Sequence, residues 1–419
     1  MTTRIALSAA TAIALLMGAA HAGSNNNAYT NQSGDYNSAE IDQSAGNGND
    51  AGSNALAIRQ VRDGTNAAVG RYNTLSITQS GDNNEIGLAN NGNPFGQNGI
   101  YQQNTYNAGT TGYNVRNEMT IQQTSSNNKV GAASQVTATH QGTNSLSITQ
   151  GGLGGHTVGS VSQFRAQTTP NVVAISQTGQ SNTVKQVQQF ASIYTSNPVA
   201  DANRIDLVMT GQDNGNDAWS VGGAASASGA TSSALIQGQS YAKHSQGGKI
   251  DLLISGDRNE YGVYQAGYRN SVGSVTVSGN DNELGIYQDG NDNALSLSTV
   301  SGDRNELGVR QIGSTNVVNL TISGDDNGGG TLAGAAGTLA LANGLVSGLI
   351  SQDGGLNTAS LTINGNGNQF ALLQDGSGNG IVGSVSGAGG NSAAVVQIGD
   401  GNTANFTQAG GTNIVAISQ

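Results

Sequence analysis

The side chains that recur at fixed spacing in this sequence are primary amides. One motif, S-G-[DN]-x-N, alternates with a second motif, Q-x-G-x-x-N, between residues 249 and 327. The motifs begin at Ser255, Ser278, Ser301 and Ser323, and at Gln265, Gln288 and Gln311. A primary amide both donates and accepts hydrogen bonds, so stacked copies of one amide can satisfy each other. This spacing predicts hydrogen bonding between stacked repeats, with no active site.

Enzymatic chemistry has little support in the residues. The histidines are scattered, and we expect each to be a satisfied or solvent-exposed side chain. They are His21, His140, His156 and His244. No Ser/His/Asp spacing, H-E-x-x-H motif or Cys/His cluster is present. The sequence therefore predicts a protein that is not an enzyme, without catalytic residues, cofactor or metal.

The amides belong to a seven-residue motif, N-x-φ-x-φ-x-Q, in which φ is apolar. Its copies begin at Asn37, Asn54, Asn73, Asn117, Asn144, Asn171, Asn259, Asn282, Asn305, Asn368, Asn391, Asn402 and Asn413. Because the motif alternates with period two, its Asn, apolar residues and Gln share one face of a β-strand. A four-residue turn with Gly usually follows. Strand and turn make a half-repeat of eleven residues.

Two half-repeats make one rung of a stack, a pattern typical of repeat proteins. We predict an all-β fold, a β-solenoid or cross-β stack of two-stranded rungs of about 22–23 residues, with irregular insertions. The predicted stacking ladder comprises Asn259, Gln265, Asn270, Asn282, Gln288, Asn293, Asn305, Gln311, Asn316, Asn368, Gln374, Asn391, Gln397, Asn402, Gln408 and Asn413. The predicted turn glycines are Gly256, Gly267, Gly279, Gly290, Gly302, Gly313, Gly376, Gly399 and Gly410. Because an unpaired buried amide costs about 1–3 kcal/mol, the end rungs should attract further strands, which predicts self-assembly.

Composition and periodicity divide the chain. Residues 1–22 have the pattern of a secretory signal peptide, with Arg4 before an apolar run and a small-residue cleavage site after it. The predicted parts that follow are a polar disordered leader (23–36), irregular repeats with insertions (37–216), an Ala/Ser/Gly-rich insertion (217–248), the regular block (249–327), a Gly/Ala/Leu-rich insertion expected to form a short helix or a loop (328–350), and C-terminal repeats (351–419). Within the irregular part, we expect residues 91–112, 151–170 and 190–202 to interrupt the repeats.

Charge and composition limit the partners. The formal net charge is −11, charged residues make up 10% of the chain, and there is no cysteine. This acidity argues against binding to nucleic acid or to anionic lipid, and no segment beyond the signal peptide approaches the length of a membrane span. The absence of cysteine excludes a disulfide scaffold in a secreted chain.

Charged residues in the regular block also bear on stacking. One set of charged residues occupies the same position in successive S-G-[DN]-x-N motifs, so stacking in register predicts a column in which positive and negative charges alternate. This set is Arg258, Asp281, Arg304 and Asp326. A second set would form a column of like charge, which we expect to face outward where water and salt screen it. This set is Glu260, Glu283 and Glu306.

Three other interpretations compete with a self-assembling stack. The Gly/Asp/Asn turns are similar to those of secreted calcium β-rolls, but the nine-residue β-roll motif is absent and the spacing here is eleven. An ice-binding or generic adhesive solenoid would use a flat outward array of Thr or a ligand face, whereas the outward positions mix Thr, Ser, Glu, Arg and Tyr. Disorder conflicts with the sustained period-two pattern.

The segment from Gln397 to Gln408, QIGDGNTANFTQ, resembles the curlin repeat. Related Q-x-G-x-x-N motifs begin at Gln32, Gln79, Gln177, Gln265, Gln288, Gln311, Gln352, Gln374, Gln397 and Gln408. Curlins are the subunits of curli, the extracellular amyloid fibres of bacteria. The resemblance implies a β-solenoid, secretion through an outer-membrane pore addressed by the leader, and a location in cell-surface fibres. It also implies assembly with itself and with another curlin-like subunit for cell adhesion and biofilm. The alternative is a non-polymerising secreted repeat adhesin or a calcium-binding β-roll-like surface protein.

Overall fold

A computed structural model describes most of the chain. The residues it describes are 24–34, 37–63, 71–88, 99–105, 115–137, 142–165, 171–191, 203–240, 243–387 and 389–419. The predicted signal peptide, residues 1–22, lies outside them. The chain divides into two compact units. The N-terminal unit is Met1–Asp206 with Gln239–Gln246, and the C-terminal unit is Leu207–Gly238 with Gly247–Gln419.

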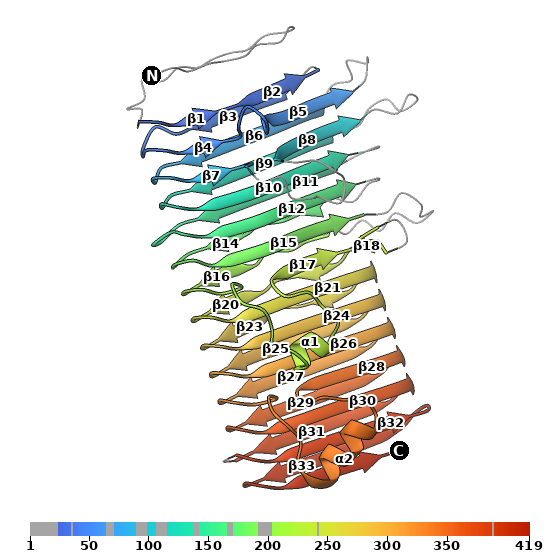
Figure 1. Cartoon of the computed structure of the whole chain (residues 1–419). Coiled ribbons are helices and arrows are strands. Elements are labelled where there is room, and N and C mark those ends of the chain that lie inside the picture. Colours follow the sequence, from blue (N-terminus) through green and yellow to red (C-terminus); the bar gives the residue numbers. More distant parts are fainter. Residues whose placement is uncertain are drawn as a thin grey trace. The chain divides into compact units, whose positions relative to one another are not determined.

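The C-terminal unit consists of two parallel sheets whose strands alternate along the chain (Figure 1). We call them sheet A and sheet B. Sheet A contains β17 (Ala234–Gln237), β21 (Glu260–Tyr268), β24 (Glu283–Asn291), β26 (Glu306–Ser314), β28 (Leu349–Gly355), β30 (Gln369–Ser377), β32 (Ser392–Ile398) and β34 (Ile414–Ser418). Sheet B contains β16 (Val208–Thr210), β19 (Lys249–Ile250), β20 (Leu253–Ser255), β22 (Ser271–Val272), β23 (Val275–Ser278), β25 (Ala294–Ser301), β27 (Val317–Ser323), β29 (Thr358–Asn364), β31 (Gly380–Ser386) and β33 (Thr403–Ala409).

The N-terminal unit has the same plan, and the same sheet names are used for it. Its sheet A contains β1 (Asn27–Ala28), β2 (Thr30–Ser33), β4 (Asp50–Ala51), β5 (Ile58–Asp63), β7 (Glu85–Ile86), β8 (Ile100–Thr105), β10 (Lys129–Thr137), β12 (Thr157–Arg165) and β15 (Thr183–Phe190). Its sheet B contains β3 (Asn37–Asp42), β6 (Arg71–Gln79), β9 (Val115–Gln123), β11 (Gly142–Gln150), β13 (Asn171–Val172) and β14 (Ser176–Gln177). The short strand β18 (Ser245–Gln246) also belongs to this unit.

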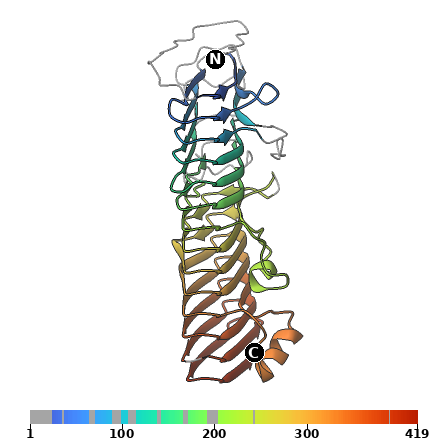
Figure 2. The ribbon, with the colours of Figure 1, turned by 60° about the vertical axis from the view of Figure 1, so that its left-hand side comes forward.

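Neighbouring strands pair in register, so that equal residues lie above one another. Between β24 and β26, Leu284 pairs with Leu307, Ile286 with Val309 and Gln288 with Gln311. These inward side chains are at most 2% exposed. Figure 2 shows the two sheets as facing layers joined by short turns. The prediction of an all-β stack of two-stranded rungs is therefore confirmed.

Three segments expected to lack repeat structure carry strands. Residues 24–34 were expected to be a disordered leader, but β1 and β2 pair with β4 and β5 in sheet A. Strands β8 and β12 lie within the expected interruptions 91–112 and 151–170. These expectations are wrong because the segments carry the same inward amides with altered spacing. Of the third expected interruption, β15 ends at residue 190, residue 191 follows it, and 192–202 lie outside the described residues.

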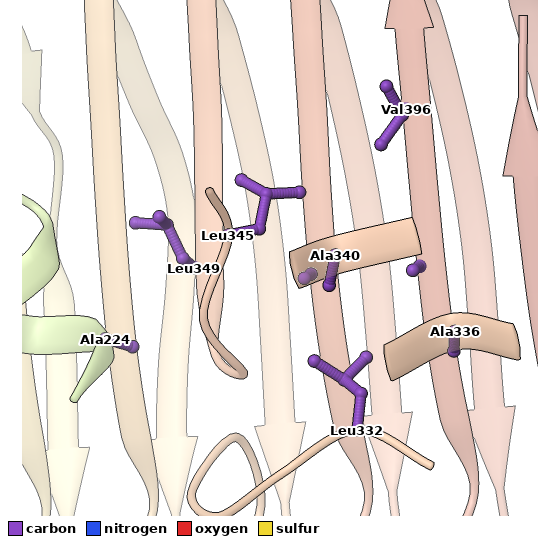
Figure 3. Close-up of a cluster of buried hydrophobic side chains, with 9 residues drawn as sticks. Ala224, Leu332, Ala336, Ala340, Leu345, Leu349 and Val396 are labelled. Carbon is purple, nitrogen blue, oxygen red and sulfur yellow. The ribbon is translucent and has the colours of Figure 1, made fainter. Parts of the chain in front are cut away.

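Residues 217–233 and 328–348 of the C-terminal unit pack on the outer face of sheet A. The prediction that all of 217–248 is an insertion is wrong, because β17 and β18 lie within it and β17 pairs with β21. Helix α1 (Ala224–Ala227) contacts β24 and β26, and α2 (Gly334–Ala342) contacts β32 and β34. In Figure 3, apolar side chains of the second insertion, among them Leu332 and Ala340, lie against sheet A. The insertion 328–350 thus forms a short helix with flanking loops. No helix among the described residues is long and apolar enough to cross a membrane.

Glycine is required beneath the first insertion. Gly262, Gly285 and Gly308 form one column on the outer face of sheet A. A Cβ atom added to Gly285 would lie 2.3 Å from the carbonyl oxygen of Ala225, and one added to Gly308 would lie 2.0 Å from that of Ala224. The insertion backbone therefore rests directly on the backbone of the sheet.

The turn glycines also stack closely, which gives a first prediction. Every predicted turn glycine has a positive φ. At Gly279 φ is +113°, and an added Cβ would lie 2.1 Å from the carbonyl oxygen of Gly302 in the next rung. At Gly401 φ is +71°, with no atom within 4 Å of an added Cβ. We expect Gly279→Ala to lower the free energy of unfolding by about 3 kcal/mol, from backbone strain plus the clash. The control Gly401→Ala should cost about 1 kcal/mol, from strain alone.

Urea denaturation of the monomer measures both variants. Equal losses would contradict the conclusion that close approach between successive turns limits this position.

Candidate functional site: the buried amide ladders

A column of glutamine side chains runs through sheet A of the C-terminal unit. Its members are Gln237, Gln265, Gln288, Gln311, Gln352, Gln374, Gln397 and Gln419. At every step the Nε2 group of one glutamine donates to the Oε1 atom of the next, over 2.8–3.0 Å. The members before Gln419 are at most 1% exposed. The column therefore has one direction along the stack.

Two asparagine columns in the same unit run in the opposite direction. One, in the turns that follow the sheet B strands, comprises Asn214, Asn259, Asn282, Asn305, Asn327, Asn368, Asn391 and Asn413. The other, in the turns that follow the sheet A strands, comprises Asn270, Asn293, Asn316, Asn357, Asn379 and Asn402. Each Oδ1 atom accepts from the next asparagine, through its backbone N–H, its Nδ2 group or both, over 2.8–3.2 Å. All the asparagines of the predicted ladder lie in these columns.

Gln408 is the one predicted ladder residue that does not stack on another amide. It lies in β33, where its register partner is Val385. The same position in the other rungs of sheet B is apolar, at Val277, Val300, Ile322 and Ile363. The Nε2 group of Gln408 donates to the backbone oxygens of Ser392 and Asn413, and its buried Oε1 atom has no partner among the described residues. The prediction for Gln408 is wrong because the glutamine column of this unit runs through sheet A, and the motif alone does not indicate that the strand of Gln408 belongs to sheet B.

The N-terminal unit has two glutamine columns, one in each sheet. The sheet A column is Gln32, Gln60, Gln102, Gln135, Gln163 and Gln189, and the sheet B column is Gln43, Gln79, Gln123, Gln150 and Gln177. Sequence reasoning missed four members of the sheet A column, Gln102, Gln135, Gln163 and Gln189. Gln135 follows Asn128 by seven residues, whereas Gln288 follows Asn282 by six. A motif search that allowed one extra residue would have found Gln135 and Gln189.

A histidine replaces asparagine in one ladder of the N-terminal unit. The backbone N–H of His156 donates to the Oδ1 atom of Asn128 at 3.1 Å, and its Nδ1 atom accepts from the backbone N–H of Asn182 at 3.2 Å. Its Nε2 atom lies 2.6 Å from the carbonyl oxygen of Gly151, which can only accept. The neutral tautomer with a proton on Nε2 is therefore the one that fits. Because the ring is fully buried, the pKa of His156 is lowered from its usual value of 6.5.

The predicted column of alternating charge is present on the turns of the C-terminal unit. Arg258 forms two hydrogen bonds with Asp281, and Arg304 forms two with Asp326, each at 2.6–2.8 Å. The guanidinium groups lower the pKa of both carboxyl groups. The pairs are largely exposed, so each contributes little to stability. They agree with the in-register stacking of the turns.

The glutamate column faces outward from sheet A, as predicted, but the expectation that water and salt screen it is wrong. Residues 217–233, called here the covering segment, lie over it. Glu260 is 5% exposed and accepts from the backbone N–H of Asp217 at 2.7 Å. Glu283 accepts from the backbone N–H and hydroxyl of Ser220. Burial, followed by the neighbouring charge of Glu283, raises the pKa of Glu306. The glutamates anchor an insertion instead of remaining solvated.

The outward residues are sorted by sheet, which the sequence did not reveal. On sheet A of the C-terminal unit they include the glutamate column and the stacked pair Tyr264 and Tyr287, with ring centroids 4.6 Å apart. On sheet B they include one register column of Thr276, Thr299, Thr321, Thr362, Ser384 and Thr407. The expectation of no flat threonine array is wrong for this face, because residues that mix along the chain separate between the sheets.

Comparisons with known proteins add no family assignment. No protein-family model matches this chain, and no curated protein matches it. Among the described residues there is no group of three or more His, Cys, Asp or Glu that could hold a metal ion. The ladders are therefore interpreted from their geometry.

Breaking one ladder position gives a second prediction. Gln288→Leu removes an acceptor from Gln265 and a donor from Gln311, so one N–H of the Gln265 amide and the Oε1 atom of Gln311 lose their ladder partners. We expect a loss of about 2–4 kcal/mol in the free energy of unfolding. The double variant Gln288→Leu/Gln311→Leu also leaves two unpaired groups, on Gln265 and Gln352, so its loss should be well below the sum of the single losses.

A double-mutant cycle in urea measures this coupling. The control Gln369→Leu removes a half-buried glutamine outside the ladder and should cost less than about 1 kcal/mol. Strictly additive single losses would contradict the account.

His156 gives a third prediction. Protonation of Nδ1 would point an N–H group at the N–H of Asn182, so the folded state binds this proton more weakly than the unfolded state. Stability is then complete above the unfolded pKa of about 6.5 and falls with decreasing pH, by up to about 1.4 kcal/mol per pH unit. No charged side chain among the described residues forms a hydrogen bond with the ring, and Lys129 on the adjacent strand is paired with Glu85.

His156→Asn restores the amide and should flatten the pH dependence between pH 5 and 7. The control His244→Asn, outside the ladder, should leave it unchanged. Urea midpoints across this range provide the measurement, and an unchanged slope in His156→Asn would contradict the assignment.

Proposed function

We propose that this protein is a secreted structural subunit that polymerises end to end into curli-like extracellular amyloid fibres, for cell adhesion and biofilm matrix. The observation that carries the proposal is the set of one-way amide ladders in parallel, in-register sheets. This arrangement repeats the hydrogen bonding of cross-β fibres, in which every strand pairs with identical neighbours above and below. The curlin resemblance supports secretion through an outer-membrane pore and a second curlin-like subunit as partner.

The last described glutamine of the C-terminal unit and the first described glutamine of the N-terminal unit offer complementary groups. Within sheet A, β34 is the last strand that the structure describes, and Gln419 has no further described glutamine to receive its Nε2 proton. Gln32 in β2 uses its Nε2 group on Gln60, while its Oε1 atom accepts from no described glutamine. The last described glutamine of the C-terminal unit therefore presents a donor, and the first described glutamine of the N-terminal unit presents an acceptor. Unlike surfaces of two copies that join head to tail produce open filaments.

The edge of β34 also presents backbone groups. The N–H of Gln419 donates to Val396, and its oxygen accepts from Ile398, both in β32. Because backbone bonding alternates along a parallel strand, Ala416 and Ser418 direct their N–H and C=O groups away from β32. An exposed row of such groups is a template for another strand.

Polymerisation gives a fourth prediction. The purified mature protein should form fibres after a lag, bind thioflavin T and give diffraction at about 4.8 and 10 Å. Ala416→Pro removes an edge-facing N–H without breaking a bond to β32, so it should fold normally but slow seeded elongation at least about tenfold. Ala416→Val keeps that N–H and should elongate at nearly the parental rate.

Thioflavin fluorescence and circular dichroism follow assembly and folding separately. A parental protein that stays monomeric and silent to thioflavin T contradicts the proposal. Equal elongation of the two variants contradicts growth at β34.

A further inference from the structure

Between β23 and β33, the outer face of sheet B carries no charged side chain, and the ion pair of Lys249 with Asp251 lies beside β19, outside this part of the sheet. The sequences of β23, β25, β27, β29, β31 and β33 contain no Asp, Glu, Lys or Arg. The chain as a whole has a formal net charge of −11, and strands of sheet A such as β21, β24 and β26 begin with glutamate. Copies of the protein therefore repel each other least across the outer face of sheet B.

This face is a regular array of small polar and β-branched side chains. We call it the threonine face, defined by the column from Thr276 to Thr407 and the parallel column Ser278, Ser301, Ser323, Asn364 and Ser386. Register pairing repeats each column at about 4.8 Å, and alternate residues of one strand lie about 6.6 Å apart. Thr299, Thr321, Thr362 and Thr407 are exposed.

The described insertions leave this face open. The helices α1 and α2 contact strands of sheet A, and Figure 2 shows both helices on the same side of the two layers. The strands of the array also contain no proline and no charged residue that would interrupt the face. Its strands, from β23 to β33, span about 29 Å by about 23 Å, or roughly 650 Å². That area approaches the about 800 Å² per partner of a stable protein interface.

We propose that the threonine face is a lateral docking surface for the same face of a second copy, which pairs two filaments side by side. The inference rests on the proposed polymerisation, because each filament then repeats the face along its whole length. Two sheets can pack face to face at about 10 Å with their small side chains interdigitated and dry. Many weak copies of one contact, linked along two filaments, give a strong association.

The test places charge on the face without changing its backbone. Thr321→Glu/Thr362→Glu adds two negative charges to each copy of the face. The control Ser314→Glu/Ser377→Glu adds the same net charge at exposed positions in sheet A strands β26 and β30. Electron microscopy and mass-per-length measurements report how many filaments each fibre contains, while thioflavin kinetics report elongation.

We expect paired filaments for the parental protein and the control, and a twofold lower mass per length for Thr321→Glu/Thr362→Glu at an unchanged elongation rate. Mixing this variant with Thr321→Lys/Thr362→Lys should restore pairing, because opposite charges then face each other. Single parental filaments, or a charged variant that still pairs, would overturn the proposal while leaving polymerisation standing.

If no fibres form, the same face is tested on soluble protein. Sedimentation should then detect a parental dimer that Thr321→Glu/Thr362→Glu dissociates at least tenfold more readily, and a parental monomer overturns the proposal. A third outcome would also overturn the proposal. If the parental protein does not pair but shapes ice crystals, and Thr321→Glu/Thr362→Glu does not shape them, the occupant of the threonine face is ordered water.

Discussion

The hydrogen bond between identical amides on successive rungs is the interaction on which this structure depends. A buried glutamine or asparagine is costly unless its donors and acceptors are all used. A stack meets that requirement only when the rungs keep one register, since a slip of one residue would turn every amide to the outer face. The small turns, the glycine column and the apolar rows between the amides all conform to this register. Gln408 illustrates the requirement, because it stacks on Val385 and its Oε1 atom lies buried without a described partner.

Much of this arrangement was predictable from the sequence because side-chain period and repeat length are both set by backbone geometry. The motif gave the inward face, the turns and the columns that include Asn282 and Gln288. The motif failed where the spacing between its asparagine and glutamine changes. Gln135 follows Asn128 by seven residues, one more than the motif allows. The motif also missed His156. An imidazole nitrogen that accepts a hydrogen bond in place of an amide oxygen can be identified only from the residues around it in the structure.

Contacts between distant segments explain the remaining differences. Nothing local to Glu260 indicates burial, since residues 217–233 reach it from elsewhere in the chain. Likewise, the threonine column cannot be read along the sequence, because alternate strands belong to different sheets. The two outer faces of the C-terminal unit therefore differ in kind. Sheet A carries charge, aromatic rings and packed insertions, whereas sheet B is open and uncharged from β23 to β33.

The opposite directions of the glutamine and asparagine columns have an electrical consequence. Every amide group carries a dipole, and dipoles aligned head to tail add up along an axis, as they do in an α-helix. Here the amide groups of the Gln288 column point one way, and those of the Asn282 column point the other. The axial dipole of each glutamine is therefore opposed by those of the two asparagines in its rung, and part of it is offset. A stack built in this way gains side-chain hydrogen bonds with every added rung while its longitudinal field grows more slowly than it would with all amides aligned.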